Sequence, residues 1–549
     1  MKTKPFAHQL ATYEHSRDRT YFGVWWEQGT GKSKLVIDTM FYLHDKREIT
    51  GVLLIAPNGV HGNFVTQELP VHAWGEYQAY VWNTGASTTK REQKLWERLM
   101  VPSPLIQVLV MSYDAVARTK QGMDVATQFL KCHKSLAVLD ESTAIANPTT
   151  QRSKQIFKLA AMARYRRVLS GTPVADGPFK IFNQMRWLDE AYWKSAGLSN
   201  NFAFQNRFAV FETANRKDGH QFRALKYYRD LDYLHRLIAP HSNRVLKEDV
   251  LDLPPKLYST VEFELAPEQR RIYDELRKTL RAKIDESLTV TVESALVALM
   301  RLQQVTSGYI GTELTPRPAL GMSVIWRGPV HMIYGVIDDL SEAVAVVRGP
   351  RVQYGETIPS ADDNEDWTQQ VRLDDPQLFL LAEAETAILN IFPEDSHNPR
   401  LRALEAVLDP ITHKVIVWAR YTRDIDGIMR MLGDRAVRYD GQTKTAEREA
   451  ALTRFRGDPS VQYFVANPMT LSMGVTLTQA KTVVYYSNTF QLEKRLQSED
   501  RAHRIGQDVS VSVIDLVARD TVDSKIVTSL RKKFNLAAQV NGDRARDWI

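Results

Sequence analysis

Short apolar runs, separated by stretches with helical spacing, are the feature that most constrains how this chain folds. The clearest are residues 52–55, 106–111, 136–139, 415–418, 462–466 and 482–486. Each is largely aliphatic or aromatic and ends at a polar or turn residue, which is typical of strands buried in a parallel sheet with helices as crossovers. Because the series occurs twice, around 20–175 and 410–520, the sequence predicts an α/β fold with two parallel-sheet lobes.

The chain is too long for one hydrophobic core, because its 549 residues exceed the size at which single cores stop growing. We expect a first lobe over 1–240 with a basic helical protrusion at about 180–240, a helical linker or protrusion of lobe two over 241–310, an acidic insertion over 311–397 and a second lobe over 398–549. The insertion has fifteen acidic against five basic residues and is rich in Gly, Pro and β-forming residues. This composition predicts a small β-containing insertion with a flexible acidic loop at Ser360–Asp366.

A glycine-rich loop follows the apolar run at 21–26 and precedes a helical pattern. It consists of Gly29, Thr30, Gly31, Lys32 and Ser33. Such a loop turns backbone N–H groups toward a polyphosphate at the start of a helix, where Lys32 would pair with the β- and γ-phosphates and Ser33 would ligate Mg²⁺. The full pattern would place glycine where the chain has Trp26, so a glycine turn beside a surface lysine is the alternative.

Two acidic residues, Asp140 and Glu141, end the apolar run 136–139. A hydrolytic ATP site requires this pair, because Asp140 can hold Mg²⁺ and Glu141 can orient and deprotonate the attacking water. Any strand can end in acidic residues before a turn, and that is the alternative. The presence of the phosphate loop favours the catalytic interpretation.

Two arginines lie three residues apart in the string Gln497–Gln507 near the end of the chain. On a helix, Arg501 and Arg504 would share one face and could reach a γ-phosphate bound on the other lobe. A solvated charged helix face is the alternative. The specific string His-Arg-Ile-Gly-Gln argues against it.

These ordered motifs resemble those of Swi/Snf-type ATPases of helicase superfamily two, especially their compact bacterial and phage members. The resemblance runs from about residue 5 to 535 and is interrupted at 311–397. It implies two RecA-like lobes, with ATP and Mg²⁺ as cofactors and Gln9 reading adenine. It implies that Ser170, Thr172 and Gln497 couple the nucleotide to lobe contacts. The candidates that it implies for DNA contact are Pro57, Asn58, Ser112, Arg420 and Thr476.

The chain departs from the family pattern at three positions. Thr143 ends the segment after Glu141, where many relatives have His or Asp, so the coupling between ATP state and lobe contacts is in question. Thr476 stands where Asn is common, in the motif Gly474–Thr478, and Phe490 lies near the usual Trp. None of these departures removes a group that hydrolysis needs.

The function predicted from these residues is an ATP-dependent translocase on double-stranded DNA. Neither lobe holds a complete site, so hydrolysis is expected when DNA bridges the lobes and closes them. The DNA contacts suit phosphates, which predicts binding that is independent of sequence and sensitive to salt. A strand-separating or branch-migrating helicase is one alternative, and a DNA-binding scaffold with an inactive motor is another.

The charge distribution raises two further hypotheses. Residues 152–248 have eighteen Lys or Arg against eight Asp or Glu, with many aromatic residues. Contact with DNA and an ordinary solvated face over an aromatic core both remain open for this stretch. The acidic insertion at 311–397 is a possible site for a protein partner or an autoinhibitory module, and a passive surface domain is the alternative.

No apolar run approaches the roughly 20 residues that span a bilayer, and the N-terminus lacks the apolar core of a signal peptide. The only cysteine, Cys132, excludes a disulfide framework and fits a reducing compartment, and we expect it to be buried. The sequence therefore predicts a soluble cytoplasmic protein with no membrane partner.

Overall fold

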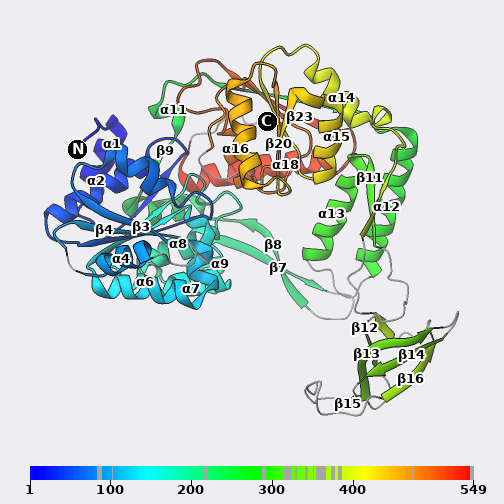
Figure 1. Ribbon diagram of the computed structural model, residues 1–549, viewed down its shortest axis with the longest axis horizontal. Coiled ribbons are helices and arrows are strands. Elements are labelled where there is room, and N and C mark those ends of the chain that lie inside the picture. The colour runs from blue at the N-terminus through cyan, green and yellow to red at the C-terminus, as the bar shows by residue number, and fades with distance from the viewer. Residues whose placement is uncertain are drawn as a thin grey trace. The chain divides into compact units, whose positions relative to one another are not determined.

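The computed structural model divides the chain into two compact units, residues 1–299 with 394–549, and residues 300–393 (Figure 1). The first unit holds both predicted lobes, and the second holds the insertion. The structure describes the whole chain except residues 83–89, 102, 216–220, 287–291, 314–322, 328–330, 341–343, 350, 354–366, 373–377, 381–385, 471–474 and 544–549.

Lobe one is built on a seven-stranded parallel sheet with the order β3-β4-β2-β5-β6-β1-β9. Its strands are β1 (Tyr21–Trp26), β2 (Gly51–Ala56), β3 (Tyr77–Val81), β4 (Ile106–Ser112), β5 (Ser135–Asp140), β6 (Tyr165–Leu169) and β9 (Ser242–Val245). Alternate residues of β2 enter two different cores, Leu53 and Ile55 one and Val52 and Leu54 the other. Both faces of the sheet are therefore buried, as the continuous apolar runs predict.

Lobe two is built on a six-stranded parallel sheet with the order β10-β23-β22-β19-β21-β20. Its strands are β10 (Lys256–Phe263), β19 (Val415–Trp418), β20 (Ala436–Tyr439), β21 (Tyr463–Ala466), β22 (Thr482–Tyr485) and β23 (Val511–Ala518). Here too the strands alternate between two cores, with Ile416 in one and Val417 in the other. The two sheets confirm the predicted α/β fold with two parallel-sheet lobes.

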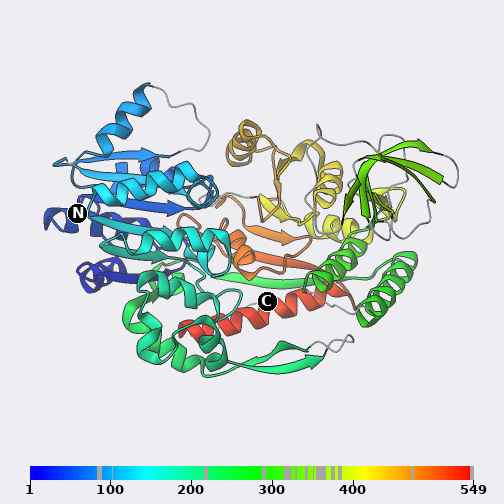
Figure 2. The same ribbon diagram turned by 90° about the horizontal axis from the view of Figure 1, so that it is seen from below.

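Helices connect the strands in both lobes, and Figure 2 shows them above and below the sheet of lobe one. In lobe one they are α1 (Ala7–Ser16), α2 (Lys32–Asp45), α3 (Leu69–His72), α4 (Lys90–Leu99), α5 (Tyr113–Arg118), α6 (Lys120–Cys132), α7 (Gln151–Ala160), α8 (Lys180–Leu188), α9 (Asn201–Phe208), α10 (Leu231–Ile238) and α11 (Lys247–Val250). Later in the chain follow α12 (Pro267–Glu286), α13 (Val292–Thr306), α14 (Pro399–Leu408), α15 (Thr422–Leu432), α16 (Thr445–Gly457), α17 (Leu492–Glu499) and α18 (Val522–Asn541). No helix among the described residues is long and apolar enough to cross a membrane.

The insertion consists of antiparallel strands, in agreement with its β-forming composition. Strands β11 (Tyr309–Glu313) and β18 (Thr386–Asn390) pair with each other. The main sheet has the order β16-β14-β13-β12-β17, with β15 paired to β13. Its strands are β12 (Ser323–Arg327), β13 (His331–Leu340), β14 (Val344–Gly349), β15 (Arg351–Gln353), β16 (Trp367–Arg372) and β17 (Leu378–Leu380). The predicted acidic loop Ser360–Asp366 lies outside the described residues.

The structure differs from the expectations in four respects. Strand β9 pairs with β1, so the sheet of lobe one continues past residue 240, and residues 256–263 of the expected helical segment form strand β10 in the sheet of lobe two. The protrusion predicted to be helical contains an antiparallel hairpin of β7 (Ala209–Asn215) and β8 (Gln221–Tyr228) between α9 and α10. Cys132 is exposed at the end of α6 rather than buried, because the apolar strand that follows starts three residues later.

Candidate nucleotide site between the two lobes

The phosphate loop joins the end of β1 to the start of α2. Gly29 and Gly31 have φ angles of +82° and +87°, a left-handed conformation that glycine adopts at little cost. The ammonium group of Lys32 donates hydrogen bonds to the carbonyl oxygens of Trp26, at 2.9 Å, and Glu27, at 3.3 Å. Trp26, which stands where the full motif has glycine, is fully buried and donates to Asn243. The loop thus has the strand, turn and helix order that phosphate binding requires.

Gln9 lies directly against this loop from α1. Its Nε2 donates to the carbonyl oxygen of Thr30 at 3.2 Å, and its Oε1 accepts from the backbone N–H of Phe6 at 3.0 Å. A Cβ atom added to Gly31 would lie 2.0 Å from Gln9 Nε2, so a larger residue here would displace the end of the Gln9 side chain. The predicted adenine-reading glutamine is therefore next to the phosphate loop.

The acidic pair lies at the end of β5. Burial and the charge of Glu141 together raise the pKa of the Asp140 carboxyl to about 7, although Lys32 opposes both. Glu141 has a φ of +50°, which is uncommon for a residue with a side chain, and its carboxylate accepts from Gln28 at 3.3 Å and from Ser170 at 3.4 Å. Two adjacent carboxylates, one half-buried and one buried, favour a nearby cation.

The residues present fit ATP with Mg²⁺. Ser33 and Asp140 would hold the ion, which would supply charge compensation for the phosphates and for the acidic pair. No cluster of three or more His, Cys, Asp or Glu side chains in the described residues could hold a metal by itself.

Arg501 and Arg504 reach the same place from lobe two. They lie in the turns that follow α17 and not on a helix face as expected, because α17 ends at Glu499. A Cβ atom added to Gly29 would lie 3.4 Å from Arg504 Cγ, which places this arginine beside the phosphate loop. Burial lowers the pKa of Arg501 to about 10, with a further contribution from Arg504, so its guanidinium remains charged at neutral pH.

One cavity of about 490 Å³ collects these groups from both lobes. Its lining residues include Gln9, Gly29, Gly31, Lys32, Ser33, Asp140, Glu141, Arg501 and Arg504. The structure thus brings together the predicted phosphate, acidic and arginine residues, which lie up to about 500 positions apart in the sequence. This arrangement provides a phosphate cradle, a base for water and two cations for developing negative charge.

Comparisons with known proteins match two parts of the chain to known domains. The chain matches the SNF2-related domain over residues 26–308 and the helicase conserved C-terminal domain over residues 400–506. The first match covers more than half of the chain. This chain belongs to the SNF2-related family. The matches confirm the predicted family and enzyme class, since the two domains are those of a DNA-dependent ATPase of helicase superfamily two.

Among SNF2-related relatives, TATA-binding protein-associated factor 172 of Homo sapiens is 27% identical over 79% of this chain and 22% of its own length. ATP-dependent helicase fft3 of Schizosaccharomyces pombe is 22% identical over 94% of this chain and 54% of its own length. The chain therefore spans between about a fifth and half of the length of these relatives. Among solved structures, the SWI2/SNF2 ATPase core of Sulfolobus solfataricus in complex with double-stranded DNA is similar to this chain. The match covers 99% of this chain and 94% of that chain, with 18% sequence identity and a TM-score of 0.37.

The candidate coupling residues of this SNF2-related chain link the acidic pair to lobe two. Ser170 donates to Glu141, and the Ser170 hydroxyl also accepts from the backbone N–H of Thr172 at 3.1 Å. Across the lobes, Glu493 of α17 accepts from Thr143 at 3.3 Å and from Gln497 at 3.0 Å. The sequence motifs gave no indication of Glu493. Its position explains how a threonine at 143 can still contact the second lobe.

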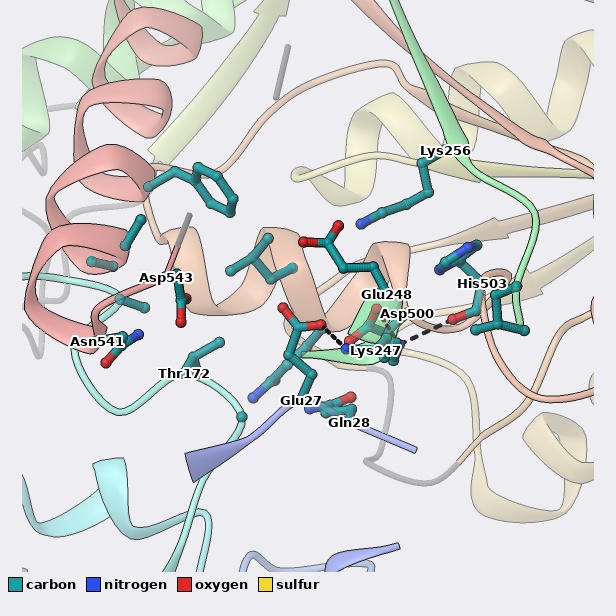
Figure 3. A pocket seen from close by; sticks show the side chains of 18 of the residues that line it. Glu27, Gln28, Thr172, Lys247, Glu248, Lys256, Asp500, His503, Asn541 and Asp543 are labelled. Carbon is teal, nitrogen blue, oxygen red and sulfur yellow. Dashed lines mark hydrogen bonds and ion pairs between the residues drawn. The ribbon is translucent and has the colours of Figure 1, made fainter. Parts of the chain in front are cut away.

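A second cavity, of about 420 Å³, lies between the lobes and shares Gln28 with the first (Figure 3). Lys247 crosses it: its ammonium group donates to Asp500 at 2.6 Å and to the carbonyl of His503 at 3.1 Å, and its backbone N–H donates to Glu27 at 2.8 Å. Burial lowers the pKa of Lys247, and Asp500 opposes that effect. Lys247 thus connects the phosphate-loop strand to the arginine segment.

Helix α18 supplies a further link between the lobes (red in Figure 2). It follows β23 of lobe two, yet Lys533 pairs with Asp176 of lobe one at 3.2 Å. Just after the helix, Asp543 accepts from Arg244 at 2.9 Å, and the same guanidinium donates to the carbonyl of Gly171 at 3.0 Å. No motif in the sequence indicated this helix, whose contacts depend on how the lobes pack.

The five candidate DNA contacts have different environments. Asn58 is exposed and Pro57 is half-buried. Ser112 is 4% exposed, and its hydroxyl caps α5 by accepting from Ala115, so this side chain is already used inside lobe one. Arg420 is half-buried beside two aromatic rings, and Thr476 accepts from Arg504 at 3.2 Å. Gly474, the start of the motif with Thr476, lies outside the described residues.

Proposed function

We propose that this chain is an ATP-driven translocase that moves along double-stranded DNA without separating its strands. The observation that carries the proposal is the shared cavity, in which Arg501 and Arg504 of lobe two lie with Lys32, Asp140 and Glu141 of lobe one. Because neither lobe has all the groups that hydrolysis needs, the rate depends on how the lobes are arranged. A motor that steps along a track requires this dependence.

Each group has a separate role in this proposal. The N–H groups of the phosphate loop and Lys32 bind the polyphosphate, and Glu141 orients the attacking water and accepts its proton. Arg501 and Arg504 stabilise negative charge on the transferred phosphoryl group. The hydrogen bond from Ser170 to Glu141, together with the contacts of Glu493, would report the state of the site to lobe two.

The proposed track is duplex DNA, bound independently of sequence. Family membership supports this proposal, and so does the chemistry of Asn58, Arg420 and Thr476, which suits phosphate oxygens rather than base edges. The involvement of Thr476 with Arg504 would connect bound DNA directly to an arginine of the ATP site. Binding is expected to weaken steeply as salt concentration rises.

Steady-state ATPase with no nucleic acid, single-stranded DNA, duplex DNA and forked DNA tests this function. Stimulation chiefly by duplex DNA, absent in Glu141→Gln, is the expected result. A preference for single strands would favour the helicase alternative, and indifference to every nucleic acid would contradict a DNA track. Loss of biological activity in Lys32→Ala would exclude a scaffold with an inactive motor.

For the insertion we propose a docking role for a protein partner, or competition with DNA for basic surface. Its net charge of −10 over residues 311–397, against +10 over residues 152–248, supports this proposal. Deletion of 311–397 should change partner binding or DNA-stimulated ATPase. The proposal is wrong if both remain as in the full chain.

We also propose that the protein acts in the cytoplasm. Its single cysteine supports this proposal, since it suits a reducing compartment.

A further inference from the structure

The hairpin β7–β8 is a surface of lobe one that the nucleotide site does not use. Its base is anchored where the ring of Phe179 stacks on Phe211, with centroids 6.3 Å apart, and packs edge-on against Tyr228 at 5.2 Å. Beyond this base the two strands extend from the lobe (Figure 1). Leu225 is 42% exposed and Tyr227 is 54% exposed. Exposed apolar side chains on a two-stranded ribbon favour a binding role, because they do not contribute to a hydrophobic core that would stabilise the ribbon.

An open groove of about 340 Å³ runs along this hairpin. Its lining residues include Asn206, Phe211, Glu212, Thr213, Arg223 and Arg229. The groove therefore offers an aromatic ring, two guanidinium groups, a hydroxyl and an amide, with one carboxylate. This combination of planar and cationic groups matches the bases and phosphates of a nucleotide chain.

Arg223 packs against two aromatic rings, Phe211 in the lining of the groove and Phe202 beside it. Its guanidinium carbon is 4.1 Å from the ring centroid of Phe211 and 4.7 Å from that of Phe202, which is 61% exposed. The same guanidinium donates to the side chain of Asn206. An aromatic ring and a guanidinium plane that are held together in this way form a stacking surface for a further flat group.

The positive charge of the groove is only partly neutralised. Arg229 donates to the backbone carbonyls of Asn206, at 2.7 Å, and of Arg207, at 3.1 Å. Among the described residues, neither Arg223 nor Arg229 forms an ion pair with a carboxylate. By contrast, Lys226 of the same hairpin pairs with Glu212 at 3.4 Å. Two guanidinium charges thus remain for an anionic ligand.

We propose that this groove binds a segment of single-stranded DNA. Unpaired bases would stack on the exposed ring of Phe202 in the Phe202–Arg223–Phe211 group, and Arg229 would contact phosphates. A duplex hides its base faces, so it would use the charge of the groove but not its rings. The proposal extends the proposed translocase, on which it depends for its biological meaning: the motor would recognise a junction where duplex DNA meets a free strand.

The test measures binding of fluorescent oligo(dT) of 20 nucleotides, and of a duplex of the same length, to the full chain by anisotropy without ATP. The parent protein is the Glu141→Gln variant, which separates binding from hydrolysis. Arg223→Ala and Phe202→Ala should each weaken oligo(dT) binding about tenfold and duplex binding less than twofold, because loss of one stacking group affects unpaired bases only. Arg223→Lys keeps the positive charge but removes the planar guanidinium group, so it should weaken oligo(dT) binding almost as much as Arg223→Ala does.

Lys226→Ala is the matched control, because it removes one positive charge from the same hairpin outside the stacking group. It should change oligo(dT) binding less than twofold. Equal losses in Lys226→Ala and Arg223→Ala would overturn the proposal in favour of unspecific charge. Unchanged oligo(dT) binding in both Arg223→Ala and Phe202→Ala would also overturn it, and would leave the exposed hairpin to a protein ligand.

Failure of this inference is distinguishable from failure of the proposed function. In the background with intact Glu141, we expect a duplex with a single-stranded arm to stimulate ATPase more than the duplex alone. Arg223→Ala should lose only this additional stimulation and keep the duplex-stimulated rate. If duplex DNA does not stimulate the unmodified chain, the translocase proposal fails, whereas the anisotropy result still decides whether the groove binds single strands.

Discussion

The two halves of the nucleotide site are held in place by different physical means. In lobe one the phosphate loop depends on backbone conformation, with Gly29 and Gly31 in the left-handed region. In lobe two the arginine segment follows α17, whose residues Arg495 and Glu499 belong to a fully buried ionic network. One half therefore depends on what glycine alone permits, and the other depends on every charge in a buried cluster being matched.

The network in lobe two is compact and closed. Arg495 pairs with Glu499 at 2.8 Å and with Asp515 at 2.6 Å, and its guanidinium lies 3.5 Å from the ring centroid of Tyr485. Lys256 of β10 completes it by pairing with Glu499 at 2.6 Å. Because these groups come from α17, β10 and β23, the cluster fixes the start of the segment that carries Arg501. The comparison leads to four predictions.

The largest effect is expected where the halves meet. Arg501→Ala should lower kcat by about 10³-fold, as removal of an arginine that stabilises phosphoryl-transfer charge does. ATP binding should remain, because the phosphate loop belongs to the other lobe. Steady-state ATPase with saturating DNA measures the loss, and Arg454→Ala, an exposed arginine of lobe two, is the matched control.

If the halves act as one site, Glu141→Gln combined with Arg501→Ala should be hardly slower than the slower single variant. Independent contributions would instead multiply the two losses. A multiplied loss would contradict a composite site, whereas a shared loss would support it.

The second prediction concerns the network itself. Arg495→Ala leaves Glu499 and Asp515 without their common partner in a buried place, and should destabilise lobe two by about 3–5 kcal/mol. Chemical denaturation followed by a probe in lobe two measures the change. Arg519→Ala is the control: it pairs with Glu262 and Glu264 at the surface, so its loss should cost less than about 1 kcal/mol. Equal losses of stability in Arg495→Ala and Arg519→Ala would show that burial of the network does not increase its contribution to the stability of lobe two.

The third prediction is a pH dependence. Burial raises the pKa of Glu499, but Lys256 and Arg495 outweigh burial and lower it to about 2, below the value of 4.5 for a free glutamate. The resulting stability is fully present above pH 4.5 and is lost as pH falls toward 2, by about 3 kcal/mol in total. The difference in unfolding free energy between the unmodified chain and Glu499→Gln should shrink over this range. A constant difference would contradict the ion-pair explanation.

The features of lobe one that depend on adjacent residues could be predicted from the sequence, whereas those that depend on packing between distant segments could not. Phosphate-loop residues are adjacent in sequence, and their conformation is local, so the roles of Lys32 and Ser33 could be predicted from the loop, with the glycine turn as the alternative. Strand β6 was not apparent, because Arg166 and Arg167 interrupt its apolar pattern; Arg167 is nonetheless 2% exposed and donates to the carbonyls of neighbouring segments. The placement of Arg501 outside a helix, the role of Glu493 and the docking of α18 depend on packing between distant segments, which motif spacing does not specify.

The smallest effect is expected in lobe one, where a single methyl group tests the phosphate loop. Gly31→Ala must adopt a φ of +87° and must displace Gln9, whose Nε2 would lie 2.0 Å from the new Cβ. We expect a cost of about 1–2 kcal/mol for the left-handed conformation and a rise of about tenfold in KM for ATP, because both the loop and Gln9, the residue predicted to read adenine, shift. Gly197→Ala is the control that measures the conformational cost alone, because its φ is +72° and no atom lies within 4 Å of the added Cβ. It should lower stability to a similar extent and leave KM unchanged. A similar KM in the two variants would mean that contact between Gln9 and the loop does not contribute to nucleotide binding.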